Sequence, residues 1–500
     1  MLARFRSADS GGRLGDRDRR VRGPEHLQLG RVLHRDGALD HRWSDRNRRR
    51  RRPGDRPRTD PSARVHGVRH VPLDRVQPLP VLRARRRSSP PLITVERPSF
   101  NPGLGTRPAC PRICSASSVR RASRTALGAF LPASVVILPV RGLDEGFDEN
   151  VRAILAQAYP SYRLLVVPDD LEDPAAIRIR EIAAEFPRIR VDLVASEPDA
   201  LRGKVNALRS ALAHLSADDA VVVFADSDIR PARDWLRQLV QPLADSSVGV
   251  ATGFRWYVPP RPTFWSLVRA EWNGVSANVL FDPRRSFAWG GSCAVRRDRL
   301  PTLRLGERWR GVLSDDLVLT QSVREAGLQI AYVPTALVAT FEGATRLMCL
   351  EWCERQITMA TLYLPVVRRY AVAAFAVFIG SIVFGALSLA LAVPWGPLYL
   401  VPAILFLAPL PSAIVKASLR RRALFSAAPE IAAAWSVPGW RSAVAALAVP
   451  WVMAWGLVRT RHPETVRWRG RVYDVRDAHR VRLVASGERR ANEGGPPSGR

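Results

Sequence analysis

Apolar runs alternate with helix-forming segments through the middle of the chain. Four runs are short and rich in Val, Ile and Leu, and they cover residues 134–140, 162–167, 190–195 and 220–225. Three segments between them predict helices, at residues 147–158, 174–186 and 204–215. Strands alternating with helices of this length predict an α/β domain with a mostly parallel sheet.

A different pattern begins near residue 370. Residues 371–393 form an apolar run of 23 residues without a charge, long enough for a helix to cross a bilayer. Further apolar runs follow at 399–415 and 444–458. The segment 423–440 contains Glu430 and two prolines, which favours an interfacial or re-entrant helix over a crossing. A buried bundle of soluble helices is the alternative for this whole region.

Basic residues indicate an orientation for these spans. The segment 416–422 predicts a basic loop on the cytoplasmic side, because cytoplasmic loops of membrane proteins carry an excess of Lys and Arg. The same bias predicts a cytoplasmic location for the basic tail at 461–500. We therefore expect an even number of crossings after residue 370.

Residues 1–130 have an unusual composition, with 31 Arg, no Lys and 11 Asp or Glu. They predict a disordered segment, because too few apolar residues are available to offset the entropy of ordering. An Arg-rich arm for nucleic acid or anionic lipid is one alternative, although nucleic acid is not expected as a partner. A start-site artefact is another, in which this segment is translated upstream of, or out of frame with, the true beginning.

Carboxylates follow two of the predicted strands. Asp169 and Asp170 come after the strand that ends at residue 167, and Asp226 and Asp228 come after the strand that ends at residue 225. The carboxyl ends of parallel strands face the crevice where open α/β sheets bind ligands. An Asp-x-Asp there suits a divalent cation shared with a diphosphate. The alternative is that Asp226 and Asp228 cap the next helix.

Lys204 is one of only two lysines among the 76 basic residues, and it follows Gly203 at the start of a predicted helix. A compact ammonium group beside free helix N–H groups suits a phosphate; an exposed surface lysine is the alternative. Asp315 and Asp316 begin another predicted helix. Such a pair either complements the helix dipole or includes a base whose pKa its neighbour raises.

Six motifs occur in order along this region. They are Asp-Asp-Leu-Glu-Asp-Pro-Ala at 169–175, Gly-Lys-Val-Asn-Ala-Leu at 203–208, Asp-Ser-Asp at 226–228, Gly-Gly-Ser at 290–292, Ser-Asp-Asp at 314–316 and Arg-Gln at 355–356. With this set, residues 131 to about 365 resemble the family 2 glycosyltransferases that have a GT-A catalytic domain. Within them, the chain is similar to the membrane-bound ceramide glucosyltransferase-like branch.

The resemblance implies roles for these residues. Asp316 would be the general base, with Asp315 beside it, while Asp226 and Asp228 would hold Mg²⁺ or Mn²⁺. Either Asp169 or Asp170 would contact the nucleobase end of the donor. The residues expected at the nucleotide-sugar donor are Asp169 or Asp170, Lys204, Asp226, Gly290, Gly291, Arg355 and Gln356. The two glycines would permit close backbone approach, or form a plain turn.

One departure from the family pattern affects the expected product. Relatives often end the catalytic core with a (Gln/Arg)-x-x-Arg-Trp motif, whereas residues 355–359 are Arg-Gln-Ile-Thr-Met. The missing Trp removes an aromatic platform that processive polysaccharide synthases use for the acceptor chain. This favours a single transfer to a lipid, and it also leaves altered activity open.

The resemblance and the patterns together predict a multi-pass protein of the inner or plasma membrane. A GT-A domain at 131–345 would lie in the cytoplasm and connect through an amphipathic interface helix at 346–370 to transmembrane helices within 371–460. It would move one sugar, with inversion, from a nucleotide diphosphate donor, UDP-linked by expectation, to a membrane lipid such as a ceramide-like lipid. The alternatives are a catalytically impaired membrane scaffold and a polysaccharide synthase.

Overall fold

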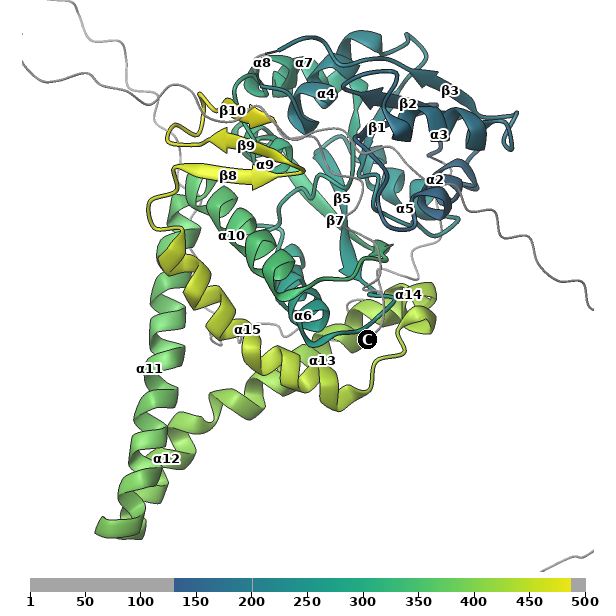
Figure 1. Cartoon of the computed structure of the whole chain (residues 1–500). Coiled ribbons are helices and arrows are strands. Elements are labelled where there is room, and N and C mark those ends of the chain that lie inside the picture. Colours follow the sequence, from purple (N-terminus) through teal and green to yellow (C-terminus); the bar gives the residue numbers. More distant parts are fainter. Residues whose placement is uncertain (1–129, 200, 487–500) are drawn as a thin grey trace, which may run out of the picture. The chain divides into compact units, whose positions relative to one another are not determined.

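The computed structural model describes residues 130–199 and 201–486 (Figure 1). The expectations for residues 1–129 therefore lie outside the described residues. A seven-stranded sheet forms the centre of the described part, in the order β3-β2-β1-β4-β6-β5-β7. Its strands are β1 Ser134–Val140, β2 Tyr162–Pro168, β3 Arg190–Leu193, β4 Val221–Ala225, β5 Val248–Tyr257, β6 Ser292–Arg296 and β7 Gln329–Thr340.

The sheet is mostly parallel. Only β6 runs antiparallel to its neighbours, β4 and β5, and the four strands predicted from the sequence all pair in parallel. Strands β4 and β5 are buried along their whole length. The sequence of β4 is accordingly a continuous apolar run, whereas β5 also contains Thr252 and Arg255. The predicted α/β class is confirmed.

Helices cover both faces of the sheet. One face packs against α2 Phe147–Leu155, α3 Pro174–Ala183 and α5 Trp235–Val240. The other packs against α4 Lys204–Ala211, α7 Leu300–Leu303, α8 Leu305–Arg308 and α9 Asp315–Glu325. Hydroxyl side chains cap the starts of several helices, as Ser314 does for α9 by accepting a hydrogen bond from the Leu317 N–H, a contact typical of helix N-termini.

Two longer helices also belong to the sheet domain, the name used here for the seven-stranded sheet and the helices packed on it. They are α6 Phe264–Leu280 and α10 Arg346–Tyr363. The backbone leaves helical geometry at Leu364, and Pro365 begins the next helix. The expected interface helix at 346–370 is thus divided between α10 and the first turn of α11.

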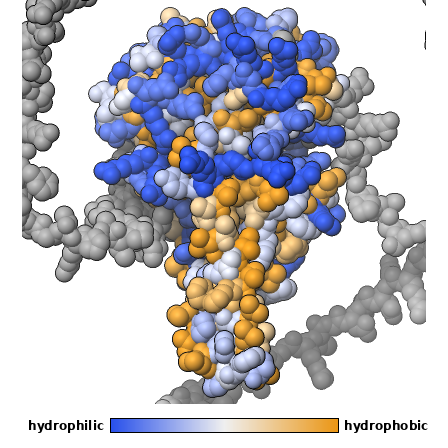
Figure 2. Space-filling model, turned by 90° about the vertical axis from the view of Figure 1, so that its left-hand side faces the viewer, coloured by the Kyte–Doolittle hydropathy of each residue, from blue (hydrophilic) through white to orange (hydrophobic). Residues whose placement is uncertain are grey.

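Three apolar helical segments follow, long and apolar enough to cross a membrane: Pro365–Trp395, Pro397–Ala427 and Gly439–Arg459. The elements are α11 Pro365–Trp395, α12 Leu400–Leu407, α13 Pro409–Ala427, α14 Pro429–Ala434 and α15 Gly439–Arg459. Figure 2 shows orange, apolar side chains over the stalk that α11 and α12 form, in contrast to the hydrophilic surface of the sheet domain. The prediction that residues 416–422 form a loop is wrong, because these residues lie inside α13.

The third apolar helix differs from the other two in its surroundings. In its most apolar stretch of 18 residues, 44% of the residues are buried inside the protein. The corresponding stretches of the other two segments are 17% and 6% buried. One side of α15 packs on α6 and α10 through a shared apolar cluster that includes Leu267, Cys353 and Val452. It therefore lies along the sheet domain (Figure 1).

Residues expected as part of a basic tail form a second sheet. Its three antiparallel strands are β8 Thr465–Trp468, β9 Arg471–Asp474 and β10 Arg482–Ser486. Val466, Tyr473 and Val475 are buried in the same core cluster as α4 and α9. The chain thus returns to the sheet domain after the apolar helices.

Candidate active site

A buried guanidinium holds both carboxylates of the Asp-Ser-Asp motif. The motif follows β4 directly, and Arg255 reaches it from β5. Arg255 Nη2 lies 2.7 Å from Asp226 Oδ2, and Arg255 Nη1 lies 2.9 Å from Asp228 Oδ2. Burial raises the pKa of Asp228 and outweighs the opposing effect of Arg255.

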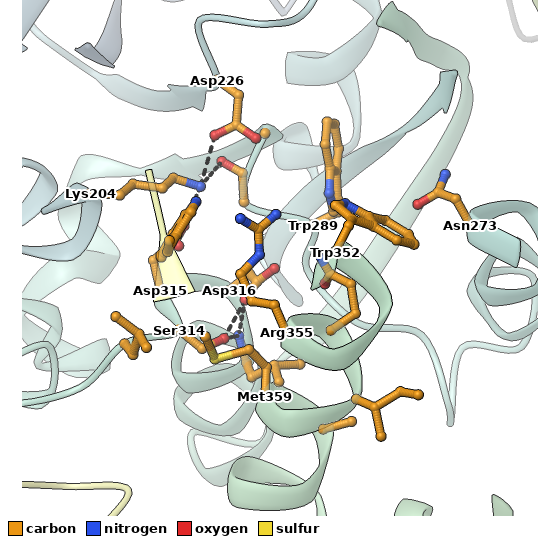
Figure 3. A pocket seen from close by; sticks show the side chains of 18 of the residues that line it. Lys204, Asp226, Asn273, Trp289, Ser314, Asp315, Asp316, Trp352, Arg355 and Met359 are labelled. Carbon is orange, nitrogen blue, oxygen red and sulfur yellow. Dashed lines mark hydrogen bonds and ion pairs between the residues drawn. The ribbon is translucent and has the colours of Figure 1, made fainter. Parts of the chain in front are cut away.

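Lys204 joins this motif to the start of α9. Its Nζ lies 2.9 Å from Asp226 Oδ1 and 3.1 Å from Asp315 Oδ2, and it donates a hydrogen bond to the Gly290 carbonyl (Figure 3). Burial opposes the charged form, but Asp226 and Asp315 raise the pKa of Lys204 above its ordinary value. Burial likewise opposes ionisation of Asp226, yet Lys204 and Arg255 lower its pKa to about 2. Lys204 is therefore a charged interior residue, not a surface lysine.

The two acids at the start of α9 have different environments. Asp315 is buried, and burial raises its pKa to about 6 although Lys204 lies beside it. Asp316 lines the cavity, and its Oδ1 accepts hydrogen bonds from Ser314 Oγ and the Leu317 N–H. Among the described residues, no protein group donates to Asp316 Oδ2. That oxygen remains available to a ligand.

Gly290 and Gly291 let these acids approach the backbone closely. A Cβ at Gly290 would lie 2.2 Å from Asp315 Oδ2 and 3.0 Å from Lys204 Nζ. A Cβ at Gly291 would lie 2.5 Å from Asp226 Oδ2. Side chains at these positions would displace the ion pairs, so both glycines are required by the geometry.

The structure separates the two acids that follow β2. Asp169 lines the cavity and forms an ion pair with Arg471 of β9. Asp170 is exposed, and its Oδ1 accepts a hydrogen bond from the Glu172 N–H in the same turn. Of the two residues, only Asp169 is placed to contact a ligand in the cavity.

Arg355 extends from α10 into the cavity without an ionic partner among the described residues (Figure 3). Its guanidinium carbon lies 5.1 Å from the ring centroid of Trp468 in β8, a cation–π contact. Burial lowers its pKa. Gln356 lines the cavity as well. An aromatic ring therefore lies beside Arg355, supplied by a strand more than a hundred residues later in the sequence.

These residues line one cavity of about 1580 Å³. At one end are the acids and cations described above. At the other, the lining is largely apolar and comes from α10, α11 and α15, with Met359, Leu364, Val367 and Leu457 among its members. The cavity therefore joins a charged region to the base of the apolar helices.

Comparison with known proteins gives this arrangement a family. The model of glycosyl transferase family 21 matches residues 109–481, which include the sheet domain, the apolar helices and most of the second sheet. The chain belongs to glycosyl transferase family 21. It is therefore a glycosyltransferase, and the predicted enzyme class is confirmed.

More distant matches were found among curated proteins and solved structures. Glycosyltransferase AglE of Haloferax volcanii is 28% identical over 125 residues, which are 25% of this chain and 39% of that protein. The mannosyltransferase PcManGT from Pyrobaculum calidifontis, solved with GDP-Man and Mn²⁺, has 22% identity and a TM-score of 0.37, over 69% of this chain and 92% of that chain. Glucosyl-3-phosphoglycerate synthase from Mycobacterium tuberculosis, solved with Mn²⁺, UDP-glucose and glycerol 3-phosphate, has 19% identity and a TM-score of 0.29, over 51% and 79%.

The acids of this family 21 protein suit a divalent cation that is held partly by the protein and partly by a diphosphate. No group of three or more His, Cys, Asp or Glu side chains converges within the described residues, so an all-protein cage for a metal is not found there. Asp226 and Asp228 do converge, however, with Arg255 between them. Two carboxylates plus phosphate oxygens are a common ligand set for Mg²⁺. The residues fit a cation that arrives with a diphosphate.

Sequence reasoning missed several residues of the site. Arg255 lies in the middle of a buried strand with no motif around it. Trp468, Arg469 and Arg471 lie in the segment that was expected to be a tail. A signal for this second sheet was present, because Arg469-Gly470 separates two short segments that contain β-branched and aromatic residues, a pattern typical of a hairpin.

We expect Gly290→Ala to lower the rate of nucleotide-sugar turnover by about a hundredfold, since the added methyl group would displace the Lys204–Asp315 pair and small displacements in an active site can have effects of this size. Gly306→Ala is the matched control, because its methyl group would meet only Leu212 at 4.0 Å. Release of nucleoside diphosphate from membranes that contain each variant measures the effect. Equal rates for the two variants would contradict the tight packing at Gly290.

Proposed function

We propose that this family 21 enzyme transfers a single sugar, with inversion, from a nucleotide diphosphate sugar to a hydroxyl group of a membrane lipid. The observation that carries the proposal is the cavity, which runs from the Asp-Ser-Asp motif to the apolar residues of α11. A donor that is soluble in water and an acceptor that lies in a bilayer would meet in such a space. A UDP-linked donor and a ceramide-like acceptor are the specific expectations that the family resemblance adds.

The charged end would bind the donor. Asp169 would lie at its nucleobase end, and Lys204 and Arg355 would face the diphosphate, which they attract as cations. Asp226 and Asp228 would hold Mg²⁺ or Mn²⁺. A bound cation of this kind neutralises negative charge on the diphosphate as it leaves. Support comes from the shared position of all five side chains in the lining of one cavity.

Asp316 would act as the general base. Its Oδ1 is held by Ser314 and the helix start, while Oδ2 has no protein donor. An acceptor hydroxyl at Oδ2 would lose its proton as its oxygen attacks the anomeric carbon, and the nucleoside diphosphate would leave from the opposite side. One base and one direct displacement give inversion. Asp315, buried and paired with Lys204, would position the start of α9.

The apolar end favours a lipid acceptor over a growing polysaccharide. The lining from α10 through α11 includes Met359, Leu364 and Val367, whose side chains offer no hydrogen-bonding groups for sugar hydroxyls. Transfer of a hydrocarbon chain from water into such surroundings lowers its free energy.

We further propose that the chain crosses the bilayer twice, through α11 and through α12 with α13. Each segment spans 31 residues, which at 1.5 Å per residue exceeds the thickness of the hydrocarbon core. Arg420 and Arg421 at the end of the return segment pair with the buried Glu271 of α6, so that end lies at the sheet domain. The second sheet also packs on that domain. The catalytic residues and residues 465–486 would then lie on one side of the membrane, which we propose is the cytoplasmic side.

In this arrangement α15 would lie in the membrane interface. It packs on α6 and α10 instead of standing free, and its exposed residues include Trp440, Trp451 and Trp455. Trp is enriched where a protein meets the headgroup region. Because α15 would not cross the bilayer, the two crossings through α11 and through α12 with α13 would give an even number.

Asp316→Asn should lower transfer by about a hundredfold or more, the usual contribution of general base catalysis, while nucleotide binding stays near that of the wild type. Asp298→Asn is the control, because Asp298 is an exposed surface acid paired with Arg296. Calorimetric titration with nucleoside diphosphate and a transfer assay measure the two properties. A parallel loss of binding and transfer would show instead that Asp316 is needed for the structure of the helix start.

Asp228→Asn should abolish the dependence of turnover on added Mg²⁺ or Mn²⁺ and lower the rate by about a hundredfold, since metal stabilisation is worth several kcal/mol. Asp218→Asn, a change in the exposed turn before the same strand, should keep the full response to the metal. Rates are measured with and without chelator. Full activity of wild-type protein in excess chelator would refute the proposed metal dependence.

The two-crossing topology predicts the labelling of single cysteines by an impermeant maleimide in intact cells. Leu398→Cys, in the exposed turn between α11 and α12, should react. Ser486→Cys, exposed at the end of β10, should react only after the membrane is made permeable. Wild-type protein gives the background. Reaction at Ser486→Cys in intact cells would place the second sheet outside and contradict the topology.

A further inference from the structure

The hairpin turn of the second sheet carries a charged side chain into the active site. β8 and β9 pair in antiparallel fashion, with Trp468 opposite Arg471, so that only Arg469 and Gly470 form the turn. Their φ angles are 47° and 74°. Positive φ at both central residues is the geometry of the tight turns that fit twisted hairpins, and Asn-Gly is the pair that this backbone prefers.

An arginine is an unusual choice for the first of these positions. Residues with a Cβ seldom adopt positive φ, and Asn and Asp do so more readily than Arg. Only two residues other than Gly have positive φ in the described part of the chain, Arg304 and Arg469. Strained positions of this kind are often found at functional sites. The backbone therefore does not favour arginine at position 469.

The side chain of Arg469 is fixed among cavity residues. Arg469 Nη2 lies 3.0 Å from Asp144 Oδ1, and its Nη1 donates to the Arg141 carbonyl at 3.2 Å. In return, Arg141 donates to the Arg469 carbonyl at 2.6 Å. Asp144 also accepts a hydrogen bond from Ser227 at 2.6 Å, in the middle of the Asp-Ser-Asp motif. Arg469 is thus one side chain away from the proposed metal ligands.

The neighbours of Arg469 on the hairpin also face the cavity. Trp468 contacts Arg355, and Arg471 pairs with Asp169. The Tyr473 hydroxyl donates to the Arg202 carbonyl at 2.9 Å. A Cβ at Gly203 would lie 2.7 Å from that hydroxyl. The hairpin therefore contacts the proposed donor site at both its nucleobase end and its phosphate end.

We propose that Arg469 binds the diphosphate of the nucleotide donor, and that the β8–β9 hairpin is a wall of the donor site. This rests on the proposed function, since it assumes a nucleotide diphosphate in the cavity. A guanidinium presents several N–H donors in a fixed plane that suits phosphate oxygens. Arg469 uses only part of this capacity on Asp144 and Arg141, so the remaining N–H groups are available for the ligand.

The test compares nucleoside diphosphates with nucleosides. Asn suits the backbone at position 469, so Arg469→Asn keeps the turn and removes the charge. Binding of UDP, GDP, uridine and guanosine to full-length protein in detergent with Mn²⁺ is measured by calorimetry. For the base that the wild type prefers, Arg469→Asn should weaken diphosphate binding about tenfold or more and leave nucleoside binding unchanged. Equal diphosphate affinity in the variant and wild type, or an equal loss for diphosphate and nucleoside, would overturn the proposal.

The matched control is Arg304→Asn, the same substitution at the other positive-φ arginine. Arg304 is exposed, pairs with Glu307 and lies outside the cavity, so this variant should bind as the wild type does. Wild-type protein that binds neither diphosphate would refute the proposed function itself.

A second measurement needs no variant. Hydrogen–deuterium exchange on the wild type should slow more at the turn residues Arg469 and Gly470 with the diphosphate than with the nucleoside, because this turn lies at the phosphate end of the site. Exchange that is the same with both would also overturn the role of the hairpin.

Discussion

Charge compensation inside the cavity is the interaction on which the site depends. Asp226, Asp228 and Asp315 lie close together with little exposure, and each is paired with Lys204 or Arg255. An unpaired carboxylate in such surroundings costs several kcal/mol. The two cations therefore make it possible to hold acidic groups at the carboxyl end of β4. They also join four elements, because the pairs connect β4, β5, α4 and α9.

The same site brings together parts of the chain that belong to different environments. Helices α10 and α11 extend the cavity from the charged cluster to apolar surface, and the second sheet returns to the cluster after the apolar helices. A polar substrate and an apolar substrate would each find matching surroundings. This arrangement explains physically why one chain would combine a sheet domain, a helical stalk and a sheet that follows it.

Elements that a pattern of neighbouring residues defines were predicted correctly from the sequence. The strands around 134–140 and 220–225 have continuous apolar runs, and the acids after them are placed at the sheet edge by strand direction alone. Arg255 could not be predicted, because it reaches Asp226 and Asp228 through the order of the strands, with β6 between β4 and β5, and no local pattern encodes this order. The hairpin at 465–474 was obscured by its high charge. Residues 416–422 lie inside α13, and Arg420 and Arg421 pair there with the buried Glu271. The contact between Arg421 and Glu271 joins residues 150 positions apart, which no local pattern encodes.

The central claim is that one sugar passes from a nucleotide donor to a lipid. Full-length protein in bilayer nanodiscs made from host lipids, incubated with Mn²⁺ and a panel of nucleotide sugars, tests this directly by mass spectrometry of the extracted lipids. The account predicts a lipid that gains the mass of one sugar, with release of one nucleoside diphosphate for each lipid modified. Release of nucleoside diphosphate with unmodified lipids, or a ladder of products with many sugars, would contradict it.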